Sequence, residues 1–307
     1  MPNLKDIKSR ILSVENTKKI TRAMKMVAAA KVKKAENSVK AGRPFSDELI
    51  KAFKKLLAAI GDSHEDGRNI KFAIENYPQL LKKRDVKTAG ILVITSNKGL
   101  AGAYNANIVR NVIKQIAENK ANGVATKLFI VGQKGISALK RKASEFDAEV
   151  LKTYTQVASE ISAAGAENVA EDLAENFVSG KIDSIEIFTT KFRNMMSYSA
   201  EKWTLLPINI EGLEVETTEI EPVMEFEPNK SAILQKTVPL YITNTIYQAL
   251  LEAQASELAS RMTAMSAASN NAEDMIRTLT IDYNKARQWA ITQEILEVVS
   301  GADALKG

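Results

Sequence analysis

Two long stretches of the sequence carry apolar residues at helical spacing and lack the residues that break helices. Residues 3–41 and residues 240–300 contain neither Gly nor Pro. In both stretches the apolar side chains recur in steps of three and four, which places them along one face of a helix. Each stretch contains two such runs: Leu4, Ile7, Ile11 and Val14, then Ile20, Met24 and Val27 in the first stretch; and Ile242, Ile246, Ala249 and Ala253, then Ile276, Leu279, Tyr283, Ala286 and Ala290 in the second.

Gly and Pro residues predict where these two helices begin and end. The first is predicted to stop at Gly42-Arg43-Pro44, and the second to begin after Pro239 and to close at Gly301. At about 1.5 Å per residue they would reach roughly 60 Å and roughly 90 Å. A helix of the second length cannot be buried inside one globule, so its surface must meet a partner.

The apolar stripes are narrow, near the two positions in seven that are typical of a coiled-coil seam. Both stretches also contain alanines, which would let two helices approach closely: Ala28, Ala29, Ala30, Ala264, Ala267 and Ala268. The simplest arrangement is a long antiparallel coiled coil of the N- and C-terminal helices. This pairing uses only part of each helix surface.

The middle of the chain has a different pattern, in which short apolar runs alternate with helical segments. Such alternation is typical of an open, Rossmann-like α/β sheet domain. The predicted strands are 89–95, 128–131, 185–190 and 203–206, and the predicted helices are 106–118, 136–142 and 164–178. The fold class is therefore α/β, with the sheet domain inserted between the two coiled-coil helices.

These patterns divide the chain into four predicted parts. The N-terminal coiled-coil helix takes residues 1–60, and the α/β domain takes residues 80–210. An acid-rich connector follows at 211–230, and the C-terminal coiled-coil helix takes residues 231–307.

Composition argues against an enzyme. The 307 residues include no Cys and a single His, His64, which lies in a polar stretch that reads as a solvated loop. Thiolate chemistry, zinc–thiolate sites and His-based catalysis therefore have little to draw on. We expect no catalytic, cofactor-binding or metal-binding residues. No secretory signal and no membrane-spanning run is evident, so we expect a cytoplasmic location.

Positive charge is concentrated at the N-terminus. Residues 1–40 contain eleven Lys or Arg residues and only three acids. Such a segment suits nucleic acid, a membrane surface or an acidic protein surface, and a solvated helix face is the simplest alternative. Charge alone does not choose among these possibilities.

Two glycine-containing turns follow predicted strands, where α/β proteins often bind nucleotides. Residues 98–102 lack the phosphate-binding spacing of glycines followed by Lys and Ser or Thr, and residues 132–135 lack the three-glycine dinucleotide pattern. We interpret both as tight turns that need glycine. A nucleotide-binding α/β enzyme with a helical arm stays a weaker alternative, as does a nucleic-acid-binding coiled coil, whose basic helix lacks interleaved aromatic residues.

The C-terminal sequence carries a family resemblance. Ile291-Thr292-Gln293-Glu294, Glu297 and Ser300-Gly301-Ala302 are similar to the C-terminal signature of ATP synthase gamma subunits. The opening helix, residues 11–28, resembles the same family, and so do residues 98–102 and 257–265. The resemblance thus covers both ends and the middle of the chain in the family's order.

The resemblance implies a non-catalytic rotor in the central stalk of a proton-translocating F-type ATP synthase. The coiled coil would turn inside a ring of alpha and beta subunits, and the α/β domain would bind the epsilon subunit and the c-ring. No nucleic acid is expected. The complex would place the chain peripherally on the cytoplasmic face of a bacterial plasma membrane.

The resemblance also implies which residues take part in coupling. Arg287 and Gln288 would make polar contacts with a beta-subunit loop, and Met24 would lie close to the beta-subunit lever. The full set of implied coupling residues is Met24, Arg261, Arg287, Gln288, Thr292 and Glu294. The chain departs from the usual pattern at Lys25, Trp289, Ala101 and Ala103. Trp289 stands where a small residue is usual, so packing around it is expected to differ.

Overall fold

A computed structural model describes residues 4–61, 80, 84–208, 227 and 230–304. The chain divides into two compact units. The sheet unit comprises residues 31–260, and the coil unit comprises residues 1–30 and 261–307. The predicted loop around His64 lies outside the described residues, as does nearly all of the predicted connector.

The two terminal helices continue through the Gly and Pro residues that were predicted to limit them. α1 spans Leu4–Gly61 and α7 spans Lys230–Ala304, so Pro44 and Pro239 lie inside helices. The predicted stop at residues 42–44 and the predicted start after Pro239 are therefore wrong. A proline inside a helix costs about 3 kcal/mol.

Burial on the far side of each proline explains why the helices continue. Beyond Pro44, α1 buries Phe53 and Leu56, and before Pro239, α7 buries Leu234 and Val238. Each such side chain contributes about 1.5–3 kcal/mol when it leaves water. Two of them are therefore enough to offset one proline.

A five-stranded sheet forms the centre of the sheet unit, in the order β3-β2-β1-β4-β5. β1 to β4 run parallel, and β5 is antiparallel to β4. The strands are β1 (Thr88–Ile94), β2 (Ala125–Val131), β3 (Glu149–Tyr154), β4 (Ser184–Asn194) and β5 (Ser197–Leu206). Strands were predicted at all of these places except β3, and the mixed α/β class with terminal helices and a mostly parallel central sheet is confirmed.

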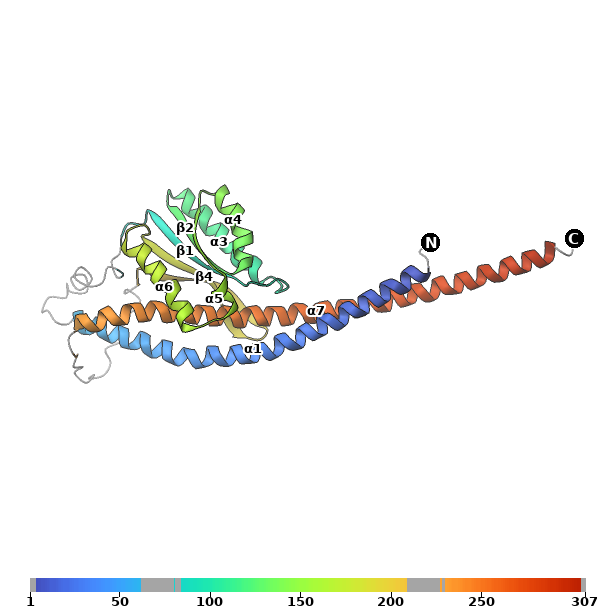
Figure 1. Ribbon diagram of the computed structural model, residues 1–307, viewed down its shortest axis with the longest axis horizontal. Coiled ribbons are helices and arrows are strands. Elements are labelled where there is room, and N and C mark those ends of the chain that lie inside the picture. The colour runs from blue at the N-terminus through green and yellow to red at the C-terminus, as the bar shows by residue number, and fades with distance from the viewer. Residues whose placement is uncertain (1–3, 62–79, 81–83, 209–226, 228–229, 305–307) are drawn as a thin grey trace. The chain divides into compact units, whose positions relative to one another are not determined.

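Helices cover both faces of this sheet (Figure 1). Alternate residues of β1 point to opposite sides: Ile91 and Val93 pack with α3 and α4, whereas Leu92 and Ile94 pack with α6 and α7. The connecting helices are α3 (Tyr104–Ala121), α4 (Gln133–Glu145), α5 (Thr155–Ser159) and α6 (Ala163–Val178). The α7 segment within the sheet unit thus completes the core instead of standing apart from it.

Candidate functional site

Two polar contacts show how α1 and α7 pair within the coil unit. Lys25 Nζ donates a hydrogen bond to Ser266 Oγ at 2.9 Å, and Lys18 Nζ lies 3.2 Å from Glu273 Oε1. Lys18 precedes Lys25 on α1, whereas its partner Glu273 follows Ser266 on α7. The two helices therefore run antiparallel, as predicted (Figure 1). Extending the same offset places Leu4 level with about Arg287.

The buried positions of this pair repeat every seven residues. α1 buries Ile7, Thr21 and Ala28, and α7 buries Met265 and Ala272. A seven-residue repeat is the pattern of a left-handed coiled coil. Small side chains at three of these positions allow the helix axes to approach closely.

The predicted stripe on α1 is wrong in its second half. Ile20 and Val27 were expected in the seam but are 60% and 57% exposed, and the seam passes through Thr21 and Ala28 instead. The six-residue step from Val14 to Ile20 does not match the seven-residue repeat, whereas Thr21 does. The Thr21 hydroxyl donates back to main-chain carbonyls of its own helix, so its burial leaves no unsatisfied donor.

The end of α7 lies beyond the region paired with α1. Every residue from Ile291 to Ala302 is exposed. At about 3.6 residues per turn, the large apolar side chains fall on one half of the helix and Gln293, Glu294 and Glu297 on the other. We call the apolar half the tip face; it consists of Trp289, Ile291, Ile295, Leu296, Val298 and Val299, all of them exposed.

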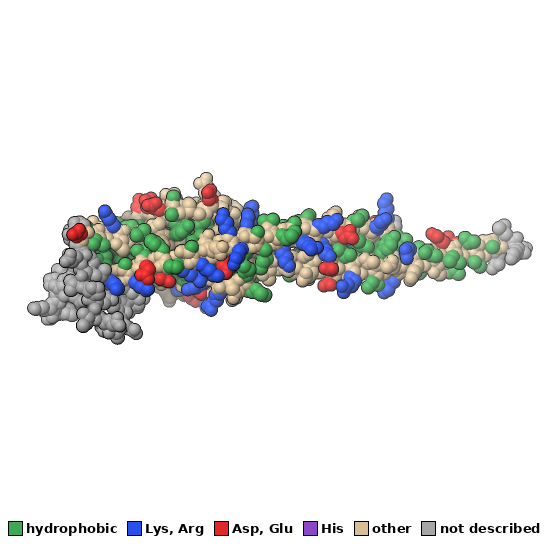
Figure 2. Space-filling model, turned by 90° about the horizontal axis from the view of Figure 1, so that it is seen from below, with side chains coloured by type: hydrophobic (Ala, Val, Ile, Leu, Met, Phe, Trp, Pro, Cys, Tyr) green, Lys and Arg blue, Asp and Glu red, His purple; other side chains and the backbone are tan. Residues whose placement is uncertain are grey.

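An exposed apolar face of this extent marks an interaction surface. Figure 2 shows hydrophobic side chains on the surface along the C-terminal end of α7, with few charged side chains among them. Further apolar side chains are exposed on the paired part of the coil unit: Leu12, Ile20, Met26, Val27, Met275 and Ile281.

All six predicted coupling residues belong to the coil unit, but they do not form one cluster. Met24 and Arg261 are half-buried in the paired region. Arg287 lies 26 residues beyond Arg261, which is about 40 Å along a helix. The predicted residues therefore form two separate groups.

The second group is itself divided between two helix faces. Arg287 and Glu294 are seven residues apart and share a face, whereas Gln288 and Thr292 lie on a face turned by roughly 130°. The Thr292 hydroxyl donates to Gln288 O at 2.9 Å, and all four side chains are exposed. Such an end can present an Arg and an acid to one partner surface and an apolar face to another.

The glycine turn between β2 and α4 has its amides occupied. Gly132 has φ +95°, which favours glycine, and a Cβ there would lie 2.2 Å from Thr95 O. The amides of Gln133, Lys134 and Gly135 donate to Asn97 Oδ1, Ser96 O and Thr95 Oγ1, respectively. These are the N–H groups that would bind a phosphate at a helix N-terminus. Internal acceptors already hold them, which supports our interpretation of a tight turn.

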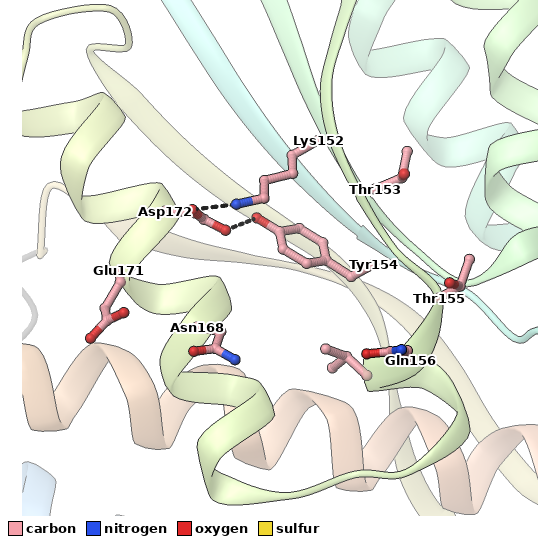
Figure 3. Close-up of a pocket in the computed structure, with 9 residues that line it drawn as sticks. Lys152, Thr153, Tyr154, Thr155, Gln156, Asn168, Glu171 and Asp172 are labelled. Atoms are coloured by element: carbon pink, nitrogen blue, oxygen red, sulfur yellow. Dashed lines mark hydrogen bonds and ion pairs between the residues drawn. The ribbon is translucent and has the colours of Figure 1, made fainter.

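An open hollow of about 440 Å³ lies between the end of β3 and helices α5 and α6 (Figure 3). Asp172 of α6 accepts hydrogen bonds from Lys152 Nζ at 2.7 Å and from Tyr154 Oη at 2.8 Å. Burial, followed by the contact with Asp172, raises the pKa of the Tyr154 hydroxyl above its usual range. The three side chains thus form one hydrogen-bonded group at the wall of the hollow.

The described residues contain no group of three His, Cys, Asp or Glu side chains placed to hold a metal ion. No helix among them is long and apolar enough to cross a bilayer.

Comparison with known proteins assigns the helix pair and the sheet to one class of protein. A family model described as ATP synthase matches residues 3–305. An ATP synthase gamma chain of Gloeothece citriformis is 40% identical over 99% of this chain and 100% of its own length. The gamma chain of Cyanothece sp. is 41% identical over the full length of both chains.

Solved structures agree. A central-stalk and c-ring chain of the Tetrahymena thermophila mitochondrial ATP synthase matches with a TM-score of 0.55 and 29% identity, covering 81% of this chain and 99% of that one. A chain of the Euglena gracilis enzyme matches with a TM-score of 0.66 and 17% identity, covering 98% and 94%, and this likeness bears on the fold.

The chain therefore belongs to the ATP synthase gamma chain family. Its function is that of the rotor subunit in the central stalk of an F-type ATP synthase, and it is a non-catalytic subunit of that complex.

Proposed function

We propose that the coil unit turns inside a ring of alternating alpha and beta subunits and sets the conformation of each beta-subunit catalytic site. The observation that carries this proposal is the exposed end of α7, where a single helix presents the tip face on one side and Glu294 with Arg287 on another. In water such a helix would expose a large apolar area, so it needs an enclosing partner.

Rotation would couple to catalysis through unequal contacts. A coil that lacks threefold symmetry touches the three beta subunits differently, and each contact stabilises one conformation of the site over the others. Turning the coil exchanges the three sets of contacts. The contact free energy is then the coupling free energy between rotor angle and catalytic state, and it acts in both directions.

The two groups of coupling residues would act at different heights. Arg287 would bind a beta-subunit loop, since a guanidinium group offers planar, multi-donor recognition of a carboxylate. Gln288, Thr292 and Glu294 would add polar contacts to the same part of the ring. Met24 and Arg261, roughly 30–40 Å away along the coil, would meet the levers of the beta subunits.

Charge supports this arrangement. The first four turns of α1 expose basic side chains, including Lys5, Lys8 and Arg10. A basic rotor surface suits acidic lever surfaces, and such complementarity sets orientation and partner choice more than affinity.

The sheet unit would bind the epsilon subunit and the c-ring at the cytoplasmic face of a bacterial plasma membrane. Protons would drive the rotation of the c-ring.

The experiment that tests the whole proposal is a co-purification of the complex through this chain. The sequence contains no Cys, so Lys114→Cys on α3, where the side chain is 79% exposed, gives a unique position for biotin.

Recovery of alpha, beta and epsilon subunits, with ATPase activity that depends on this chain, is the expected result. The chain recovered alone or with nucleic acid would contradict the proposal. The second result would favour a basic coiled coil that binds phosphate backbones, whose binding would weaken steeply with salt.

A further inference from the structure

An ionic cluster around a buried carboxylate joins three elements of the sheet unit at one point. Glu252 of α7 is 2% exposed, which is unusual for a carboxylate. Its Oε1 accepts hydrogen bonds from Arg43 Nη2 at 3.0 Å and Arg43 Nε at 3.2 Å, and from Gln248 Nε2 at 3.2 Å. Its Oε2 accepts from the main-chain N–H of Phe192, in β4, at 2.7 Å.

The guanidinium group and the carboxylate hold the same strand residue. Arg43 Nη2 also donates to Phe192 O at 2.8 Å, so both main-chain groups of Phe192 are bound by side chains of the two helices. The pairing of β4 with β5 is irregular immediately after Phe192. Phe192 itself is in register with Tyr198 of β5, but the pairing of β4 with β1 ends at Phe188, so no described strand covers the other edge of β4 at Phe192.

The close approach of α1 and α7 beside Glu252 requires a glycine at position 42. A Cβ on Gly42 would lie 2.8 Å from Gln248 Oε1, so glycine leaves room for the side chain that supports Glu252. Gly42 and Arg43, which read as a stop signal in the sequence, thus belong to a packed contact between α1 and α7.

A second polar link lies two turns further along α7. Tyr198 Oη of β5 donates to Ser260 Oγ at 2.9 Å, and Ser260 Oγ donates to Ala101 O at 2.7 Å. Three residues before Glu252, Thr189 Oγ1 of β4 donates to Ala249 O at 3.3 Å. The strands are therefore tied to α7 at several heights.

We propose that Arg43 and Glu252 form a torsionally stiff joint through which torque passes between the sheet and the helix pair. This inference rests on the rotor function proposed above. The surrounding α7 surface is small and apolar (Ala249, Ala253 and Ala255), and apolar contact is non-directional, so it resists sliding and twisting poorly. Hydrogen bonds weaken steeply with misalignment.

A twist that moves Phe192 away from the two helices would remove the main-chain N–H from Glu252 Oε2 and would leave Phe192 O without its Arg43 donor. The Arg43–Glu252 ion pair would stay intact, because both residues lie on the helices. A buried polar group that loses its hydrogen-bond partner nevertheless costs its full desolvation penalty, and the penalty is larger for a charged group. The joint therefore responds to small displacements with a large restoring force. Arg43 and Glu252 are positioning residues in this role, since they act on the rotor and touch no nucleotide.

The test measures torsional stiffness in the intact ATP synthase that contains this chain, held by its alpha and beta subunits. A bead is attached at Lys114→Cys on α3 or, in a separate preparation, at Lys236→Cys, an exposed position of α7. ATP drives rotation, and the angular spread of the bead is recorded at each pause. The variants are Arg43→Met and Glu252→Gln, both measured per assembled complex.

We expect a wider angular spread for the α3 bead in both variants and an unchanged spread for the α7 bead. Ser46→Ala is the matched control, because it removes a hydrogen bond between Asn244 and Ser46 that joins the two helices without touching a strand. It should change neither bead. A mere loss of stability would lower the amount of complex but leave both spreads as they are.

Glu252→Gln keeps an oxygen that can accept from Phe192 N–H, so it is the milder substitution. It therefore tests the joint even if the complex with Arg43→Met does not assemble. An unchanged spread for the α3 bead in Glu252→Gln overturns the joint, and so does an equal widening for both beads. A wild-type complex whose beads never rotate with ATP would instead refute the rotor proposal itself.

Discussion

Leu296 offers the sharpest test of whether the tip face is enclosed. Its side chain is 59% exposed, so Leu296→Ala removes little buried surface from the free chain. The substitution deletes three carbons, each contributing about 0.8 kcal/mol when buried. In the free chain we therefore expect a loss of less than about 1 kcal/mol. Inside an apolar sleeve the loss should approach about 2 kcal/mol, or roughly 30-fold in a binding constant.

Two measurements separate these cases. The free energy of unfolding of the free chain is followed by circular dichroism, and binding of the chain to the alpha–beta ring is measured by competition with wild type. Gln293→Ala, on the polar half of the same turns, is the control and should weaken binding less. Equal binding of Leu296→Ala and wild type would refute enclosure. A free chain destabilised as much as the complex would show that the tip packs against its own chain.

Four further outcomes follow from the structure. Arg287→Ala should lower proton-driven ATP synthesis and leave the melting of the free chain unchanged, because Arg287 is exposed. Leu173→Ala, at a fully buried position, should cost about 2–5 kcal/mol in urea unfolding. Gly132→Ala should destabilise by more than about 1 kcal/mol, since φ is +95° and a Cβ would meet a strand carbonyl. Burial raises the pKa of Tyr104 and of Tyr154, so both phenols keep their protons in the native state above about pH 10, where the unfolded state releases them. The free energy of unfolding should therefore fall as the pH rises past about 10, and it should fall less in Tyr104→Phe and Tyr154→Phe.

Each of these has a clear contrary result. Normal synthesis by Arg287→Ala would remove that residue from the coupling set, and Leu173→Ala unfolding like wild type would contradict the packing between α6 and the sheet. Wild-type stability of Gly132→Ala would mean that the turn relaxes. A stability that stays flat from pH 9 to pH 11 would place both phenols in contact with water.

The sequence predicted the central strands and missed an edge strand for one physical reason. β1 is buried on both faces and reads as a continuous apolar run, which is a strong signal. β3 lies at the sheet edge, and most of its residues, Glu149 to Thr153, are only half-buried or exposed. An edge strand with polar residues has no such run, and only its pairing with β2 reveals it.

Helix limits and the seam failed for related reasons. Pro44 and Pro239 are local signals, and the burial that overrides them comes from residues brought together by the fold. Apolar identity likewise suggested Ile20 for the seam, whereas the seven-residue repeat selects Thr21. Counting strictly by seven from Ile7 would have found it.

The sequence partly predicted the exposed apolar surface of α7, but it did not predict the joint between Arg43 and Glu252. The apolar end of α7 is visible in the sequence as a run after residue 288, and its division into two faces follows from the helical repeat. Arg43 and Glu252 are 209 residues apart, and the group that they hold is a main-chain amide. No pattern of side-chain types along the chain indicates such a contact.

Two parts of α7 differ in chemistry in the way that the proposed rotor mechanism requires. In the sheet unit its buried polar side chains recur every four residues, at Gln248, Glu252, Ser256 and Ser260, and three of them make directional hydrogen bonds. Beyond residue 288 it exposes an apolar face whose contacts have no preferred direction. A shaft must hold its load without slipping and turn in its bearing without catching. Directional, buried contacts suit the first task, and non-directional, apolar contacts suit the second, so the change of chemistry along one helix is what a rotor requires.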